Sequence, residues 1–244
     1  IGLVGSEMCI RDRVCLNRPY GDMEHAFRNM AYKSHPYRFP VIGKEFSHIE
    51  KVVPDDVRSW FYSHYAPNNA VLAVCGNVEF GLVRELVEKW YGSIPRRDIA
   101  PRLYANEPLP DSPRFVEMSG NVPQTALNIA YPMAQYGEMG YFAADILSDI
   151  LANGKSSRFY RRLLLETDLF TEVDAAIQGS EEPGLFTINA KLRGDDRATE
   201  QKAIEAIRGE LRRLCEEEVP QRELQRCINR LCLLYTSPSP RDRS

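Results

Sequence analysis

The chain has 244 residues, of which 43% are hydrophobic and 27% are charged, and its formal net charge is −3. This composition is ordinary for a globular protein with a real core, and the charge gives no electrostatic case for binding nucleic acid or an anionic membrane. No apolar run approaches the length of a membrane span. The cysteine spacing contains no C-x-x-C motif, so we expect free, buried thiols at Cys15, Cys75, Cys215 and Cys227.

The two ends of the chain look foreign to the rest. Residues 2–13 can be encoded by a DNA element whose reverse complement, read one base in, encodes residues 232–242. That element resembles a sequencing-library transposon adapter; the alternative is a pair of unrelated natural tails. We therefore expect residues 1–13 and 232–244, which include Cys9 and Cys232, to be non-native, and residues 14–231 to be an internal fragment.

The first predicted helix follows a turn at Asn17–Gly21. Its apolar side chains recur at helical spacing, as Met23, Phe27, Met30 and Ala31. An aromatic loop over residues 34–43 contains two prolines, which exclude a helix interior. A second short helix begins at Pro54-Asp55-Asp56, whose acidic first turn suits the helix dipole. Its predicted apolar face is Val57, Trp60, Phe61 and His64.

The stretch from Tyr65 to Pro95 has the clearest pattern in the chain. A turn at Ala66–Asn69 precedes an apolar, β-branched run at Ala70–Cys75, which predicts a buried strand. An amphipathic helix follows, and Gly92 is placed to end it. The predicted apolar stripe of this helix is Leu82, Val83, Leu86, Val87, Trp90 and Tyr91.

The second half begins with a proline-rich and charged linker over residues 96–112. The apolar side chains of the strand at 124–131 do not alternate cleanly, which predicts that both of its faces are covered. Strand pairs are followed by helix pairs, so we predict an α+β fold with a mixed or antiparallel sheet and helices packed on one face. The predicted strands are 114–118, 124–131, 170–177 and 184–192, of which the last two form a hairpin. The predicted helices are 141–151, a helix that begins after an N-cap at Ser156 or Ser157, 199–215, and a helix that begins at Pro220.

Catalytic chemistry is hard to find in these residues. The four histidines, His25, His35, His48 and His64, include no pair at i, i+4 and no glutamate at metal-site spacing. Glu24-His25 lacks a second histidine, so surface or capping roles are favoured for all four. No G-x-S-x-G, P-loop or G-x-G-x-x-G motif occurs. The remaining candidates have structural interpretations: Gly137–Gly140 as a loop, Asp195-Asp196 as helix N-terminal charge and Glu216–Glu218 as a solvated face.

An ordered set of short motifs nevertheless resembles one family. They are Asn17-Arg-Pro-Tyr-Gly21, His35-Pro-Tyr37, Pro40-Val-Ile-Gly43, Tyr65-Ala-Pro-Asn-Asn69, Gly76-Asn-Val78, Trp90-Tyr-Gly92, Ser156-Ser-Arg-Phe-Tyr160 and Pro183-Gly-Leu-Phe186. Each motif is weak alone, but the series strongly resembles the insulinase-like (pitrilysin) zinc metallopeptidases, above all their short bacterial members. The resemblance covers residues 14–231.

The resemblance implies two related α+β domains that clamp an unfolded peptide. In the family the first domain carries H-x-x-E-H on a helix. Its two histidines and a downstream glutamate bind zinc, and the motif glutamate activates water. On this reading residues 14–50 are the remnant of the N-terminal peptidase domain, and residues 51–231 are an incomplete C-terminal, substrate-clamping domain.

This chain departs from the family where the chemistry lies. It contains no H-x-x-E-H, and the third zinc ligand would precede Asn17, inside the adapter-like segment, so Glu7 receives no role. Some relatives hold substrate with an arginine and a tyrosine, and the aligned residues here are Leu164 and Thr171. Ser157-Arg158 matches the family, but packing at a helix start explains it as well as substrate contact does. We therefore expect no catalytic, substrate-binding or metal-binding residue in this chain.

The sequence thus predicts a fragment of a zinc-dependent endopeptidase that acts on peptides or unfolded proteins. We expect zinc in the full-length parent and none in this fragment, which is predicted to be inactive alone. The expected partners are a peptide substrate and a second peptidase half or a homodimer partner. Alternatives are a non-catalytic subunit of a two-subunit peptidase and an unrelated α+β binding domain; the cytoplasm and the periplasm both stay open. Residues 14–49 are expected to leave four side chains without packing partners: Phe27, Met30, Tyr37 and Phe39.

Overall fold

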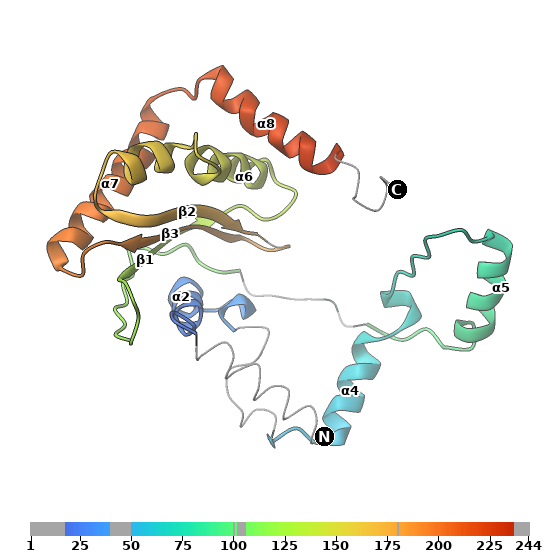
Figure 1. Cartoon of the computed structure of the whole chain (residues 1–244). Helices are drawn as coiled ribbons and strands as arrows, with labels where there is room; N and C mark the ends of the chain where they lie inside the picture. The colour runs from blue at the N-terminus through green and yellow to red at the C-terminus, as the bar shows by residue number, and fades with distance from the viewer. Residues whose placement is uncertain (1–17, 40–49, 100, 102–105, 180, 237–244) are drawn as a thin grey trace. The chain divides into compact units, whose positions relative to one another are not determined.

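The computed structural model of the chain describes residues 18–39, 50–99, 101, 106–179 and 181–236 (Figure 1). The contacts divide these residues into two compact units. The first unit contains the described residues between 34 and 106, and the second contains those between 18 and 33 and between 107 and 236. Within the described ranges, no helix has the length and apolar character needed to cross a membrane. The boundary predicted at residue 50 separates segments from two different domains of the parent protein. The contacts within this chain do not test that assignment, so it stays a prediction.

The first unit is built on two helices that the sequence predicts. Helix α4 runs over Pro54–His64, and the Val53 amide donates a hydrogen bond to Asp56 Oδ2 at its start. Helix α5 runs over Phe80–Tyr91, and Gly92 is its C-cap, as predicted. Two short 3-10 turns complete the unit, η1 at Pro36–Arg38 and η2 at Pro67–Asn69.

The buried strand predicted at Ala70–Cys75 is wrong. The segment forms no strand, and Val71 is 97% exposed. A strand needs a neighbour to satisfy its backbone N–H and C=O groups, and no strand of the described residues pairs with this one. The predicted apolar faces of α4 and α5 are largely exposed for the same reason, since the described first unit contains no sheet; Val83 and Val87 of α5 are half-buried. Cys75, in this segment, is an exposed thiol, and Cys215 of the second unit is exposed too, so the expectation that both are buried is wrong. Cys227 is buried as expected, and Cys15 lies outside the described residues.

The second unit contains a three-stranded antiparallel sheet in the order β1-β3-β2. Its strands are β1 at Ala126–Met133, β2 at Phe170–Gln178 and β3 at Gly184–Leu192, which confirms the predicted hairpin. The strand predicted at Arg114–Met118 is wrong. Arg114 Nη1 instead donates to the carbonyl oxygens of Met30 and Ala31, which holds this segment along the end of helix α2.

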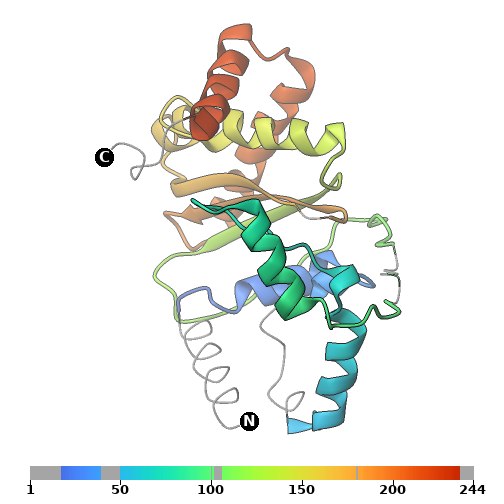
Figure 2. The same ribbon diagram turned by 90° about the vertical axis from the view of Figure 1, so that its right-hand side faces the viewer.

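The larger helices lie on one face of the sheet (Figures 1 and 2). They are α6 at Met139–Ala152, the π-helical turn η3 at Tyr160–Leu165 and α7 at Arg197–Glu216; α8 at Gln221–Thr236 packs on α6. This arrangement confirms the α+β prediction. The core between helices and sheet is fully apolar at its centre, with Leu151, Phe159, Phe170, Ile188 and Ile207 at or near zero exposure.

Helix α2, at Met23–Ala31, packs on the opposite face of the sheet. Asn128 of β1 donates from Nδ2 to Met23 Sδ at 2.7 Å. Phe27 is only 7% exposed, so the expectation that it lacks packing partners is wrong. Helix α2 therefore covers the second face of the sheet. This agrees with the sequence of β1, in which apolar and polar side chains do not alternate cleanly. Phe39 is 52% exposed, as expected for a side chain without a core to enter.

Candidate functional site

A polar cluster lies where the turn before α2 meets the sheet. It consists of Tyr20, Gln124, Thr171, Glu172 and Lys191, and we call it the Tyr20 cluster. Tyr20 precedes α2, Gln124 leads into β1, Thr171 and Glu172 begin β2, and Lys191 is near the end of β3. Antiparallel pairing places Glu172 opposite Lys191, which brings the two strand ends together beside Gln124.

Tyr20 is held in an unusual backbone conformation at this place. Its φ of 66° lies in the left-handed region, which costs an L-residue about 1–2 kcal/mol. Its hydroxyl donates to the Gln124 carbonyl oxygen at 2.7 Å and accepts from the Gln124 amide at 3.2 Å. These two hydrogen bonds fix the turn against the start of β1 and offset part of the strain. Strained residues gather at binding and catalytic sites more often than elsewhere.

Thr171 and Lys191 supply the exposed hydrogen-bonding groups of the cluster. Thr171 Oγ1 donates to Gln124 Oε1 at 3.0 Å and lies 3.3 Å from the Lys191 carbonyl oxygen. Lys191 Nζ donates to Glu172 Oε2 at 2.6 Å, and this hydrogen bond raises the pKa of Lys191. The same ammonium lies 5.9 Å from the centre of the Tyr20 ring, which is within cation–π range.

The chemistry of the cluster is that of hydrogen-bonding and charged side chains. The cluster offers a hydroxyl, an amide, an ammonium and a carboxylate, all near solvent, but no activated nucleophile. Across the part of the chain that the structure describes, no group of three histidine, cysteine, aspartate or glutamate side chains is arranged to hold a metal ion. The described residues therefore offer no side-chain set that fits a zinc site of the family type, and no step through zinc is derived from them.

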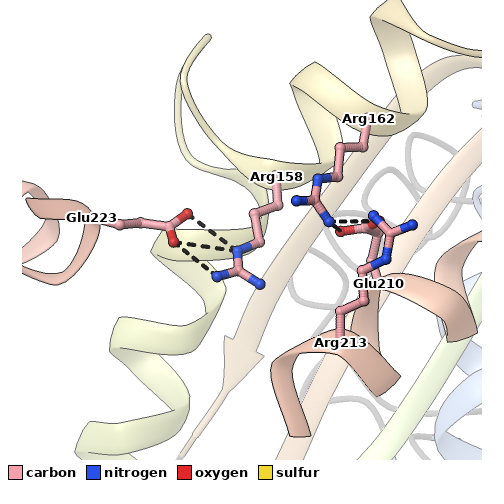
Figure 3. Close-up of polar contacts among 5 residues, drawn as sticks. All are labelled: Arg158, Arg162, Glu210, Arg213 and Glu223. Atoms are coloured by element: carbon pink, nitrogen blue, oxygen red, sulfur yellow. Dashed lines mark hydrogen bonds and ion pairs between the residues drawn. The ribbon is translucent and has the colours of Figure 1, made fainter. Parts of the chain in front are cut away.

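The family-matching pair Ser157-Arg158 is part of the interior. Ser157 is fully buried, and Arg158 is 9% exposed. Arg158 forms a forked ion pair with Glu223 of α8, in which Nη2 and Oε2 are 2.9 Å apart (Figure 3). The hydrogen bond to Glu223 raises the pKa of Arg158 further. Ser157 Oγ has no hydrogen-bond partner among the described residues. Of the two serines expected to cap the helix, Ser157 therefore does not donate or accept a capping hydrogen bond through its hydroxyl.

A second buried carboxylate binds two arginines beside this pair. Glu210 of α7 accepts from Arg162 at 3.2 Å and from Arg213 at 3.1 Å, and its side chain is 6% exposed (Figure 3). Together the two networks tie η3 to α7 and α8. Packing and ion pairs inside the protein therefore account for the Ser157-Arg158 motif.

The described histidines have local structural surroundings. His64 Nδ1 is 2.9 Å from the Trp60 carbonyl oxygen within α4, and its ring stacks on Trp60. His35 Nδ1 accepts from the Tyr37 amide and caps η1, which is the capping role that the sequence favours. His25 is half-buried on α2, and His48 lies outside the described residues.

The two positions aligned with the family's substrate residues have different surroundings. Leu164 lies in η3 and packs against the apolar core. Thr171 belongs to the Tyr20 cluster. Sequence reasoning assigned no role to Tyr20, Gln124, Glu172 or Lys191. The hairpin register was the available signal, because it predicts that residues near the open ends of β2 and β3 face each other.

The other acidic and glycine motifs have the structural roles that the sequence indicates. Asp196 is the N-cap of α7, and its carboxylate accepts from the Thr199 amide at 2.9 Å. The hydrogen bonds from Thr199 hold the pKa of Asp196 below its ordinary value. Gly137, with φ of +92°, forms the turn before α6.

Comparisons with known proteins agree with this architecture. A protein from Helicobacter pylori named zinc protease PqqE is 28% identical over 214 residues, which is 86% of this chain and 47% of the relative. The crystal structure of a protease from Helicobacter pylori has a TM-score of 0.79 at 26% identity and covers 96% of this chain and 56% of that one. The peptidase M16 inactive domain from Pseudomonas fluorescens has a TM-score of 0.76 at 18% identity, covering 99% and 57%, and shows the fold.

The chain spans about half the length of the curated relative that it matches. A family model described as "Peptidase M16 inactive domain" matches residues 51–231. The match covers most of the chain, and it includes the whole sheet and every helix on its main face. This chain therefore belongs to the insulinase-like M16 peptidase family, in the part of it described as the inactive domain.

Proposed function

We propose that the parent protein is a zinc endopeptidase and that this chain supplies its non-catalytic, peptide-holding half. The observation that carries the proposal is the match of residues 51–231 to the inactive domain of the M16 peptidases. The Helicobacter pylori relative that is named a zinc protease supports the same activity for the parent. We propose that zinc is bound by residues of the parent that this chain lacks.

The sheet offers a suitable surface for an extended peptide. Both outer strands, β1 and β2, have one edge without a strand neighbour among the described residues. An extended segment can add to such an edge by main-chain hydrogen bonds. The Tyr20 cluster lies at the end of both strands and presents side-chain donors and acceptors for the same peptide. Polar contacts of this kind, made without a deep side-chain pocket, suit a peptidase that accepts varied unfolded substrates.

Peptide binding without hydrolysis is the direct test. A labelled, unfolded peptide of neutral side chains is titrated with the chain and followed by fluorescence anisotropy, while mass spectrometry checks that the peptide stays intact. Lys191→Met should weaken binding roughly two- to five-fold, the value of one lost hydrogen bond. Lys202→Met, which removes an exposed lysine from α7, should leave binding unchanged. Equal binding by both variants, or hydrolysis of the peptide, would contradict the proposal.

A second role is favoured by the departures at Leu164 and Thr171. The parent could be a non-catalytic subunit that pairs with an active peptidase, since neither position keeps the arginine or tyrosine of substrate-binding relatives. The coding sequence upstream of residue 14 separates the two roles. An H-x-x-E-H motif there supports the enzyme, and its absence supports the partner subunit.

A further inference from the structure

Three arginines form a ladder along one side of α8. Arg222, Arg226 and Arg230 follow one another at four-residue spacing, so they lie in one stripe of the helix. They lie on one open face of α8. A parallel stripe of amide side chains, Gln221, Gln225 and Asn229, lies on the same face.

The positive charge of this ladder is not neutralised within the described structure. Glu223 is the sole carboxylate in α8, and it is turned inward to form the forked pair with Arg158 (Figure 3). Arg222 and Arg230 enter no ion pair with another described residue. Arg226 donates from Nη1 to the Ser156 carbonyl oxygen at 2.9 Å, a neutral acceptor. The ladder thus carries three positive charges without an ion-pair partner among the described residues, and Arg222 and Arg230 are the two whose side chains are exposed.

The surroundings add to this excess of donors. Arg222 lies in the first turn of α8, where the helix dipole is already positive. The loop at residues 153–157 carries the exposed Lys155, and Arg230 Nη1 lies beside Gly154 of that loop. Arg158 Nη1 and Arg226 Nη2 are buried without a hydrogen-bond partner among the described residues. Both of these donors are out of reach of a ligand on the open face of α8, so the exposed cations there are Arg222, Arg230 and Lys155.

We infer that the α8 ladder binds an extended acidic peptide segment. Helical residues four apart are separated by about 6 Å along the axis. Alternate side chains of an extended chain are separated by about 6.6 Å, so carboxylates at every second position match the arginine spacing. The adjacent amide stripe can exchange hydrogen bonds with the peptide groups of the same segment.

A peptide fits this surface better than the other polyanions do. Single-stranded nucleic acid is held by aromatic side chains on which bases stack, and this face of α8 includes none. Peripheral membrane helices insert an apolar face, whereas this face of α8 consists of arginine and amide side chains over residues 221–230. The inference does not depend on peptide hydrolysis by the parent protein, so it goes beyond the proposed function.

The test uses the whole chain and a labelled nine-residue peptide with glutamate at alternate positions, followed by fluorescence anisotropy. Arg222→Gln and Arg230→Gln should each weaken binding roughly two- to five-fold, as expected for an exposed ion pair, and the double variant should weaken it further. Arg208→Gln is the matched control, because it removes the same charge from an exposed position on α7. Arg226 is left unchanged, since it also fixes the loop at Ser156.

Three comparison ligands make the result decisive. A peptide with glutamine in place of every glutamate should bind at least ten-fold more weakly, and raising the salt concentration should abolish the difference. A single-stranded oligonucleotide and vesicles with an anionic lipid should both bind more weakly than the acidic peptide. Tighter binding by either, or an equal loss of affinity with Arg208→Gln, would overturn the inference.

Discussion

Arg158 and Glu223 join the start of the η3 segment to α8 through a forked ion pair that is almost closed to solvent, with side-chain exposures of 9% and 17%. The pair connects residues 65 positions apart in the chain. A charged pair in such a place is satisfied only while both partners are present, because either charge alone has lost its water.

Removal of Glu223 should therefore be costly. We expect Glu223→Ala to lower the free energy of unfolding by about 3–5 kcal/mol, since it leaves the Arg158 charge buried and unpaired. Urea denaturation followed by circular dichroism measures the change. Glu205→Ala is the control, because Glu205 forms an exposed pair with Arg212 and should cost less than about 1 kcal/mol. Equal losses in the two variants would show that the Arg158–Glu223 pair does not hold α8 in place.

The apolar core should respond most strongly at its most buried ring. Phe170 is fully buried, so Phe170→Ala should cost about 3–5 kcal/mol in unfolding free energy. Phe115 is 71% exposed, and Phe115→Ala should change it by less than about 0.5 kcal/mol. Chemical denaturation of both variants checks the contrast. A large loss at Phe115 would mean that residues 114–118 are packed in solution, as the original strand prediction required.

The N-cap of α7 should make the stability of the second unit fall in acid. Hydrogen bonds from Thr199 lower the pKa of Asp196, so its folded-state pKa lies below the ordinary 3.8. Its contribution is therefore present above about pH 4 and is lost as the pH falls through the lower, folded-state pKa. The melting temperature of Asp196→Ala should lie below that of the wild type at pH 6, and the gap should close towards pH 2. Asp195→Ala, at the exposed neighbouring position, should show no such closing gap.

Asp145 should affect the pH dependence of stability in the opposite direction. Burial, followed by the nearby charge of Asp149, raises the pKa of Asp145 above 3.8, so the charged form is disfavoured in the folded state. The folded protein is therefore penalised as the pH rises through this raised pKa. Asp145→Asn should raise the melting temperature at pH 7 and leave it unchanged below pH 3.8. Asp111→Asn removes an exposed carboxylate and should change neither value. A lower melting temperature for Asp145→Asn at pH 7 would show that the Asp145 charge does not destabilise the folded protein.

The sequence predicted the second unit well because its elements are amphipathic and their partners are present. Ala203 and Ile207 show the helical period of α7, and both are fully buried. Residues 70–75 carry an equally strong strand pattern but stay exposed. The local sequence pattern indicates which face of a segment would be buried, but the burial itself requires a neighbouring strand. The described residues provide no such strand for residues 70–75.

The polar cluster and the π-helical turn could not be predicted in the same way. Tyr20 and Gln124 are 104 residues apart, and neither carries a motif that points to the other. The left-handed backbone of Tyr20 is unusual for a tyrosine, so residue type gave no signal. The π-helical hydrogen bonding of Tyr160–Leu165 depends on how this segment packs, not on its apolar spacing. The absence of H-x-x-E-H, by contrast, is read directly from the sequence.

The central proposal is that this chain holds peptides but does not cut them. Zinc titration by calorimetry, combined with a fluorogenic unfolded-protein assay on the same sample, tests it most directly. We expect no stoichiometric, tight zinc binding and no peptide cleavage at any zinc concentration. One tightly bound zinc per chain together with cleavage that a chelator abolishes would contradict the account.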